Sequence, residues 1–380
     1  MVSLAGTQAS MSLLGKIRQI RWGMVAILIS IVAIGIATLY SAGNGSFDPW
    51  ASRQLIRFSG GLVLMIAVAC VDIRVWLRYA YVVYGISLVL LVWVDINGLT
   101  GMGAQRWVAV GPVSLQPSEV MKVAIILVLA RYFHGLQAED AGKLVPLLWP
   151  LVLVILPVLL VLKQPDLGTA IMLLLAAGAV FFLAGVRVWM FAVAILGVGG
   201  LLPLAWGHLK DYQRNRLLTF INPDNDPLGA GYHILQSKIA LGSGGLFGRG
   251  FLEGTQSHLN FLPEKQTDFI FTMLAEEWGL VGGLVLLTLY LVLVAYGYAI
   301  GIRSRSQFGR ILAMGLTTMF FLYIFINVAM VMGLVPVVGV PLPLISYGGT
   351  AMLSIQIAFG IILGCYVHRD VVIGRRGGFD

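Results

Sequence analysis

Residues 144–162 read LVPLLWPLVLVILPVLLVL, a run without a single charged side chain. A helix of about 20 apolar residues is long enough to cross the hydrocarbon core of a membrane, which is about 30 Å thick. The composition of the whole chain agrees with this reading, because 59% of the residues are hydrophobic, 11% are charged and the mean hydropathy is +0.91. The sequence therefore predicts a polytopic membrane protein of the all-α class.

Similar apolar runs recur along the chain and predict about ten transmembrane helices. They lie near residues 22–41, 54–71, 79–95, 119–134, 144–162, 167–185, 188–207, 269–300, 311–333 and 350–367. We expect one membrane domain over residues 16–368, with a disordered tail at 1–15 and a cytoplasmic tail at 369–380. The segment 208–268 should remain outside the membrane, and such long loops are usually functional.

The distribution of lysine and arginine predicts the orientation. Basic residues cluster before the first helix, at Lys16, Arg18 and Arg21, and again between the last helices, at Arg303 and Arg305. Because Lys and Arg are enriched in cytoplasmic loops, both termini should be cytoplasmic and segment 208–268 should face the periplasm or cell exterior. Basic inner loops facing anionic lipid also account for the net charge of +8, so no nucleic-acid partner is implied.

The sequence lacks several motifs that would indicate a particular chemistry. The two cysteines, Cys70 and Cys365, lie in separate apolar runs, so they form neither a CxxC metal motif nor a disulfide framework. The sequence contains no HExxH and no GxxxxGK[ST], which argues against zinc hydrolysis and direct use of ATP.

An acid stands at the start of one apolar run. Residues 261–279 read FLPEKQTDFIFTMLAEEWG, and Asp268 comes directly before FIFTMLA. A charge within a membrane helix is costly, so Asp268 is a functional candidate. The alternative is that Thr267 or Asp268 caps the helix by accepting backbone N–H bonds in its first turn.

Three further polar motifs flank predicted helices on the same outer side. GAQRW at 103–107 places Arg106 and Trp107 in a Gly-rich loop, and QPSEVMK at 116–122 puts Glu119 and Lys122 on one helix face. KQPDLGT at 163–169 brings Asp166 to the outer end of another helix pair. The alternatives are an internal ion pair for Glu119 and Lys122, interfacial anchors for Arg106 and Trp107, and a helix cap for Asp166.

Two glycine-containing segments complete the outer motifs. PLPLISYGGT at 341–350 should form a partly re-entrant turn, which protein or water must cover. GSGGLFGRG at 242–250 could contact phosphate through backbone N–H groups or could be a flexible turn. When segment 208–268 is counted as one, five polar motifs fall on one membrane face, which predicts an outward-facing site. Its candidate acids are Glu119, Asp166, Glu264 and Asp268, and its candidate bases are Arg106, Lys122, Lys238 and Arg249.

The motifs together resemble the SEDS family (shape, elongation, division and sporulation), and NFLPEKQTDFIFTMLAEE and ISYGGT resemble its elongation (RodA) type. The resemblance spans residues 22–368 and implies ten transmembrane helices with peptidoglycan glycosyltransferase activity. Such an enzyme polymerises lipid II into glycan strands on the outer face of the bacterial cytoplasmic (inner) membrane. The pair Lys265-Gln266 departs from the family pattern, which leaves any role for a histidine beside Asp268 in doubt.

The resemblance also implies roles for individual residues. Asp268 matches the family's essential acid and would be the general base on the 4-hydroxyl of the acceptor GlcNAc. Arg106 and Lys122 would bind the leaving diphosphate, with Glu119 orienting Lys122. A divalent cation such as Mg or Mn could assist, with Asp268 and Glu119 as its ligands, although no metal-specific spacing is present. The remaining substrate-binding candidates are Trp107, Asp166, Lys238 and Arg249.

Partners and rival functions follow from the same resemblance. Family members work with a class B penicillin-binding protein, which is a transpeptidase, and elongation types also with MreC, MreD and related shape proteins. The alternatives are a lipid II flippase or other lipid-linked transporter, a division-type (FtsW-like) member, and a structural scaffold. A transporter would more naturally show repeated halves with broken helices at the midplane, and the sequence shows no internal repeat.

Overall fold

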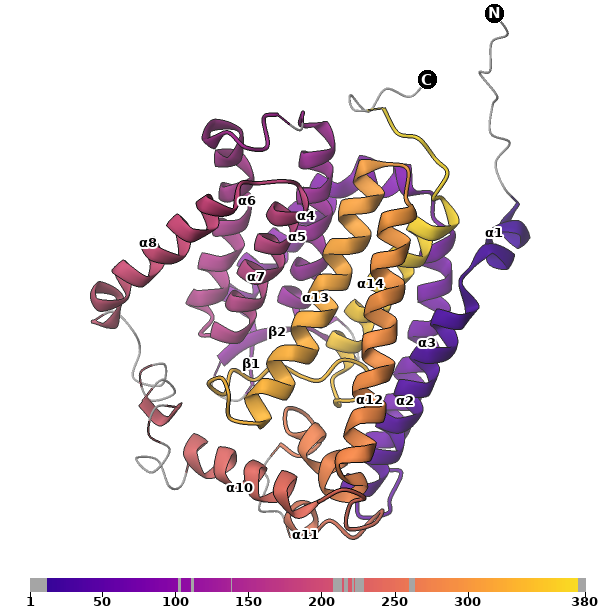
Figure 1. Cartoon of the computed structure of the whole chain (residues 1–380), viewed down its shortest axis with the longest axis vertical. Helices are drawn as coiled ribbons and strands as arrows, with labels where there is room; N and C mark the ends of the chain where they lie inside the picture. The colour runs from indigo at the N-terminus through magenta and orange to yellow at the C-terminus, as the bar shows by residue number, and fades with distance from the viewer. Residues whose placement is uncertain are drawn as a thin grey trace, which may run out of the picture.

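The computed structural model describes residues 12–101, 104–110, 113–137, 139–207, 214, 218–220, 222, 229–259 and 264–374 (Figure 1). Their helices and strands, in chain order, are α1 (Leu13–Gln19), α2 (Trp22–Ala42), α3 (Trp50–Cys70), α4 (Ile73–Asn97), β1 (Leu99–Gly101), β2 (Ala104–Val110), β3 (Val113–Leu115), α5 (Pro117–Gly135), α6 (Leu144–Lys163), α7 (Leu167–Leu183), α8 (Val188–Trp206), α10 (Ala230–Ser243), α11 (Thr255–His258), α12 (Ile270–Arg303), α13 (Gln307–Val331) and α14 (Gly349–Val367).

Each of the ten predicted apolar runs is a helix, with ends that differ from the prediction by a few residues. Within the described ranges, seven helices are long and apolar enough to cross a membrane, and two shorter apolar helices lie at Leu167–Leu183 and Val188–Gly197. The tenth, α5, is as long as the others but carries Glu119, Lys122 and Arg131. The chain is an integral membrane protein of the all-α class. The tail predicted at 1–15 is described only from residue 12, and α1 begins at Leu13.

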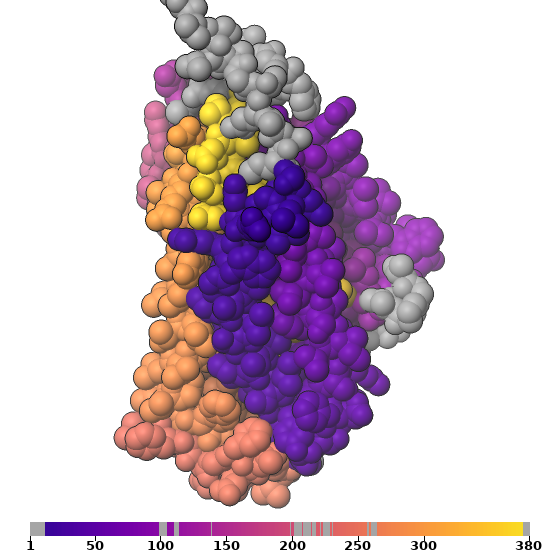
Figure 2. Space-filling view, turned by 90° about the vertical axis from the view of Figure 1, so that its right-hand side faces the viewer, coloured from indigo at the N-terminus to yellow at the C-terminus, as the bar shows by residue number. Residues whose placement is uncertain are grey.

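Both ends of the described chain lie at one end of the bundle, called here the α1 end (Figure 1). There, Lys16 Nζ donates to the carbonyl of Cys70 at the end of α3 (2.9 Å), and the Arg305 amide donates to the carbonyl of Arg369 after α14 (2.9 Å). The opposite end, called the α11 end, is covered by α10 and α11, which form the lower surface in Figure 2. This arrangement agrees with the prediction that both termini lie on the same side.

The centre of the bundle is α5, which buries nearly every residue from Pro117 to Ala130. It packs against α4, α7 and α13, and α13 in turn contacts α12 and α14. Glycine lets α14 approach α3 closely, because a Cβ at Gly360 would stand 2.7 Å from the carbonyl oxygen of Met65. Polar side chains on α5, α13 and α14 therefore face protein rather than lipid.

The residues AQRW, at 104–107, lie in a strand and not in the predicted Gly-rich loop, while Gly103 lies outside the described residues. β1, β2 and β3 form an antiparallel sheet in that order, in which Leu99 pairs with Trp107 and Val108 with Leu115. Valine and tryptophan in β2 suit a pleated surface, but its sequence AQRWVAV does not alternate between apolar and polar residues, and β1 and β3 have only three residues each. The sheet fixes Arg106 and Trp107 on a paired backbone.

In its described part, the long outer segment contains the helices α10 and α11, and its glycine-rich piece has a structural role. α12 breaks at Gly279, whose φ of 68° is in the left-handed region. The amides of Arg249 and Gly250 donate to the carbonyls of Glu276 and Glu277, while those of Leu280 and Val281 donate to Gly245 and Leu246. The interpretation of residues 242–250 as a flexible turn is therefore wrong, because the amides of Arg249 and Gly250 and the carbonyls of Gly245 and Leu246 are bonded to α12, while phosphate contact stays a prediction.

Two buried acids before the break hold α11 in place. Glu276 accepts a bond from the Gln256 amide at 2.8 Å, in the first turn of α11. Glu277 accepts from the Ser41 hydroxyl at the end of α2, and its Oε1 lies 3.1 Å from Nε2 of His258. The α11 end is thus tied to α2 and α12 by buried polar contacts.

Candidate functional site

The polar network around Glu119 lies in the first turn of α5. Lys122 Nζ donates to Glu119 Oε1 at 2.6 Å, and both side chains are almost fully buried. The other carboxylate oxygen accepts from the Tyr323 hydroxyl at 2.7 Å and from the Ser354 hydroxyl at 3.1 Å. The Lys122 ammonium also lies 4.5 Å from the centre of the Tyr323 ring. The prediction that Glu119 and Lys122 share a helix face is confirmed.

A second polar cluster joins strand β2 to the turn between α6 and α7. Arg106 Nε lies 3.8 Å from Asp166 Oδ2, and the guanidinium also donates to the carbonyls of Gln164 and Pro165. Asp166 is the N-cap of α7, since it accepts from the Thr169 amide at 3.2 Å and from its hydroxyl at 2.9 Å. The capping alternative for Asp166 is therefore confirmed, together with its pairing to Arg106.

Asp268 lies in the turn that leads into α12. The N-cap position is Phe269, which makes no side-chain capping bond, and the Thr267 hydroxyl donates back to Glu264 at 2.9 Å. The interpretation of Thr267 as the cap is therefore wrong. A Cβ at Gly339 would stand 3.3 Å from Asp268 Oδ2, so this glycine leaves room beside the carboxylate. Nearby, burial lowers the pKa of Lys265.

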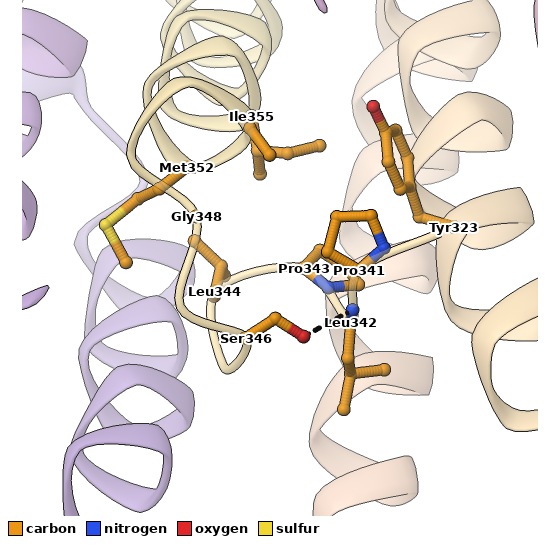
Figure 3. Close-up of a pocket in the computed structure, with 10 residues that line it drawn as sticks. Tyr323, Pro341, Leu342, Pro343, Leu344, Ser346, Gly348, Met352 and Ile355 are labelled. Atoms are coloured by element: carbon orange, nitrogen blue, oxygen red, sulfur yellow. Dashed lines mark hydrogen bonds between the residues drawn. The ribbon is translucent and has the colours of Figure 1, made fainter. Parts of the chain in front are cut away.

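The loop that joins α13 to α14 forms a pocket next to this turn (Figure 3). Residues 341–348 supply most of its wall, and Tyr323, Met352 and Ile355 close it from α13 and α14. It is small, with room for about one water molecule. The Ser346 hydroxyl accepts from the Leu342 amide and donates to the carbonyl of Thr267, both at 2.7 Å, which fixes the loop against the Asp268 turn.

α13 connects these two parts of the site. Tyr323 binds Glu119, and Asn327, one turn later on the same helix, donates to the carbonyl of Asp268 at 2.9 Å. Gln116, the residue before α5, donates to Asp166 Oδ2 at 3.5 Å, which joins the two clusters. The structure thus brings Arg106, Asp166, Glu119, Lys122 and Asp268 to one region at the α11 end of the bundle.

The remaining predicted residues lie further out or make other contacts. Trp107 pairs with Leu99 within the sheet and is half-buried. Lys238 is exposed on α10, and the end of its side chain lies against Gly333 after α13. Arg249 is exposed beside the α12 break, where its amide bonds Glu276. No contact joins Lys238 or Arg249 to Asp268 among those that the structure describes.

Sequence reasoning missed four residues of this region: Tyr323, Asn327, Ser346 and Arg57. Arg57 lies within α3, with its guanidinium 4.9 Å from the centre of the Tyr347 ring. A charge inside the apolar run 54–71 was a signal that could have identified it. Asn327 gave a weaker signal, as a lone amide in the apolar stretch FLYIFINVAMV.

The donor set at Glu119 does not fit a divalent metal. Both of its oxygens already accept bonds from Lys122, Tyr323 and Ser354. Within the described part of the chain, no group of three or more His, Cys, Asp or Glu side chains could hold a metal ion. The assignment of Glu119 as a metal ligand is therefore not supported, and a metal at Asp268 remains a prediction.

The geometry offers a carboxylate at Asp268, a buried cation at Lys122 and a partly exposed cation at Arg106 in one region. A carboxylate can accept a proton from a hydroxyl nucleophile, and guanidinium or ammonium groups can stabilise developing negative charge on phosphate oxygens. The arrangement therefore suits transfer of a group from a phosphate-linked donor to a hydroxyl.

Comparisons with known proteins give a consistent result. Residues 16–370 match the family of cell cycle proteins that includes FtsW, RodA and SpoVE. The peptidoglycan glycosyltransferase MrdB of Escherichia coli K12 is 45% identical over 350 residues, which is 92% of this chain and 94% of the relative. A chain of a peptidoglycan synthase complex that coordinates polymerization and crosslinking is similar with a TM-score of 0.81 and 32% identity, covering 92% and 98% of the two chains. The rod shape determining protein RodA of Thermus thermophilus is similar with a TM-score of 0.69 and 29% identity, covering 92% and 97%.

Proposed function

The chain belongs to the family of cell cycle proteins that includes FtsW, RodA and SpoVE, and from this premise we infer that it is a peptidoglycan glycosyltransferase of the elongation type. The inference is supported by 45% identity to MrdB across almost the full length of both proteins. We propose lipid II as its substrate, because an activated lipid donor supplies the driving force without a nucleotide motif.

In the proposed reaction, the 4-hydroxyl of an acceptor GlcNAc attacks C1 of a donor MurNAc. The new bond joins the acceptor oxygen to C1, while the bond from C1 to the lipid diphosphate breaks and its electron pair leaves with the diphosphate. The hydroxyl proton passes to the carboxylate of Asp268. General base catalysis of this kind typically contributes about 100-fold to 10,000-fold.

The observation that carries this assignment is the position of Asp268. Its carboxylate lies beside Gly339 in a turn whose helix N-cap is a different residue, Phe269. The turn is bonded to the loop of residues 341–348 through Ser346, and this loop is the proposed wall of the acceptor site next to the carboxylate.

The leaving diphosphate is assigned to Arg106 and Lys122, which differ in exposure. The Arg106 side chain is 32% exposed and is the group that an entering diphosphate can reach. The Lys122 side chain is only 3% exposed, so it acts from within its pair with Glu119, as a buried positive charge next to Tyr323. Asp166 orients Arg106, while Trp107, Lys238 and Arg249 remain proposed contacts for more distant parts of the substrate.

We also propose the cellular setting. The α11 end faces the periplasm or cell exterior of the cytoplasmic membrane, consistent with the basic residues at the α1 end. A class B penicillin-binding protein is the proposed partner, since a similar chain belongs to a synthase complex that coordinates polymerization with crosslinking. MreC, MreD and related shape proteins are proposed partners by the same family membership, and a divalent cation is a proposed aid to the diphosphate.

Asp268→Asn tests the reaction. The variant is assayed with purified lipid II in liposomes together with the cognate transpeptidase, and Glu253→Gln, at an exposed acid of the outer segment, is its control. Asn keeps the size of Asp and caps helices about as well, but an amide does not accept the hydroxyl proton at neutral pH. We expect glycan polymer to fall by at least about 100-fold in Asp268→Asn, with normal folding, and to be unchanged in the control.

Near-normal polymer from Asp268→Asn would remove Asp268 from the mechanism. If the wild-type protein moved lipid II across the liposome membrane but made no polymer, the flippase alternative would replace the polymerase.

A further inference from the structure

Three consecutive carbonyl oxygens in the turn before α12 each accept a hydrogen bond from a distant part of the chain. The Gln266 carbonyl accepts from the Tyr347 amide at 2.8 Å, and the Thr267 carbonyl accepts from the Ser346 hydroxyl at 2.7 Å. The Asp268 carbonyl accepts from Asn327 Nδ2 at 2.9 Å. The first two donors belong to one loop, whereas the third belongs to the transmembrane helix α13.

Asn327 is fully buried and uses both hydrogens of its amide. The second one goes to the carbonyl of Val340, at 2.7 Å. Val340 follows Gly339, the residue whose missing side chain leaves room beside the Asp268 carboxylate. The Asn327 amide therefore holds two segments against α13. One is the backbone of Asp268, and the other is the loop at Val340, next to the Asp268 side chain.

The helix that carries Asn327 is itself fixed. Tyr323, one turn earlier, donates to Glu119 on α5, and most residues of α13 are buried against other helices. A donor on such a helix is a rigid reference point, unlike one on a loop. The position of a general base strongly affects the reaction rate, because displacing the base by about 1 Å can lower the rate by about 100-fold.

We propose that Asn327 is a positioning residue for Asp268: its side-chain amide fixes the Asp268 backbone against α13 and keeps the carboxylate at the distance that proton transfer requires. The proposal rests on the proposed function of Asp268. It assigns Asn327 no contact with the substrate, so its loss should lower kcat and leave KM nearly unchanged.

The test compares Asn327→Leu with a matched variant, Gln356→Met. Gln356 is also a buried amide whose Nε2 donates to a backbone carbonyl, that of Phe58 at 3.0 Å, but it joins α14 to α3. Each substitution removes a buried donor and keeps the approximate shape of the side chain. The measurements are kcat and KM for lipid II polymerisation and the thermal unfolding midpoint of each purified protein.

We expect both variants to lose thermal stability, but only Asn327→Leu to lose kcat by about 100-fold, with KM within about threefold of the wild type. Equal effects of the two variants on kcat, or a change confined to KM, would overturn the positioning role. If Asn327→Leu does not fold, Ser346→Ala removes the donor to the neighbouring Thr267 carbonyl, and we expect it to lower kcat by about tenfold. An unchanged kcat in Ser346→Ala would then show that hydrogen bonds to the backbone of this turn do not position Asp268.

The double variant Asp268→Asn, Asn327→Leu separates failure of this proposal from failure of the proposed function. If Asn327 acts through Asp268, the double variant should polymerise no more slowly than Asp268→Asn alone. A further loss in the double variant would show that Asn327 acts independently of Asp268. If Asp268→Asn alone has normal polymerisation activity, Asp268 is not the general base, regardless of the activity of Asn327→Leu.

Discussion

The Tyr323 hydroxyl donates a 2.7 Å hydrogen bond to Glu119 Oε2, while Glu119 Oε1 accepts a 2.6 Å bond from Lys122. The acid thus has a cation on one oxygen and neutral donors on the other, because Ser354 also donates to Oε2. A buried carboxylate and ammonium are tolerated only when paired and hydrogen-bonded in this way. The internal ion pair inferred as one alternative from the sequence exists, and whether Lys122 also serves the substrate is a separate question.

The paired variants Lys122→Met and Lys122→Met, Glu119→Gln answer that question. Lys122→Met leaves the Glu119 carboxylate buried without its cation, which should destabilise the protein by about 3–5 kcal/mol. The double variant removes the charge as well, so we expect it to regain most of the lost stability. If Lys122 stabilises the leaving diphosphate, polymerisation should stay at least about 100-fold below the wild type in both variants.

The two measurements are the thermal unfolding midpoint in detergent and the polymerisation rate with lipid II. Recovery of both stability and rate in the double variant would assign the pair a structural role alone. The proposed function requires that the double variant recover stability but not the polymerisation rate.

The sequence predicted the ten helices of the apolar runs because length and hydropathy are local properties of each run. It made Asp268 a candidate for a physical reason as well, since a charge beside an apolar helix is costly. The strands were missed because β1 and β3 have only three residues each and β2 does not alternate between apolar and polar residues. The role of residues 242–250 was misjudged because their hydrogen-bond partners, Glu276 and Glu277, lie outside the motif.

The contacts made by α13 were beyond sequence reasoning for a different reason. Tyr323 and Glu119 are 204 positions apart, and Asn327 and Asp268 are 59 positions apart. Their meeting depends on how α13 packs against α5 and on the turn before α12, and neither packing is encoded in a local pattern. Within an apolar helix, a single Tyr or Asn has no spacing that would reveal its partner.

The break in α12 gives a test of backbone geometry. At Gly279, φ is 68° and a Cβ would clash with the backbone nitrogen of Gly248, so Gly279→Ala combines an unfavourable conformation with a steric clash. We expect it to destabilise the protein by about 2 kcal/mol or more. The control is Gly85→Ala in α4, where a Cβ meets nothing within 4 Å and a helical alanine should be neutral or stabilising by up to about 1 kcal/mol. Thermal unfolding of both variants checks this, and equal midpoints would show that the break tolerates a side chain.

Single cysteines test the orientation on which the proposed site depends. Glu253, near α11, and Arg305, in the turn between α12 and α13, are both exposed and lie at opposite ends of the bundle. In a protein whose Cys70 and Cys365 are replaced by alanine, Glu253→Cys should react with a membrane-impermeant maleimide added to intact spheroplasts. Arg305→Cys should react only after the membrane is permeabilised, because basic turns are retained in the cytoplasm. The reverse labelling would place Asp268 on the cytoplasmic side, where it could not extend glycan strands outside the membrane.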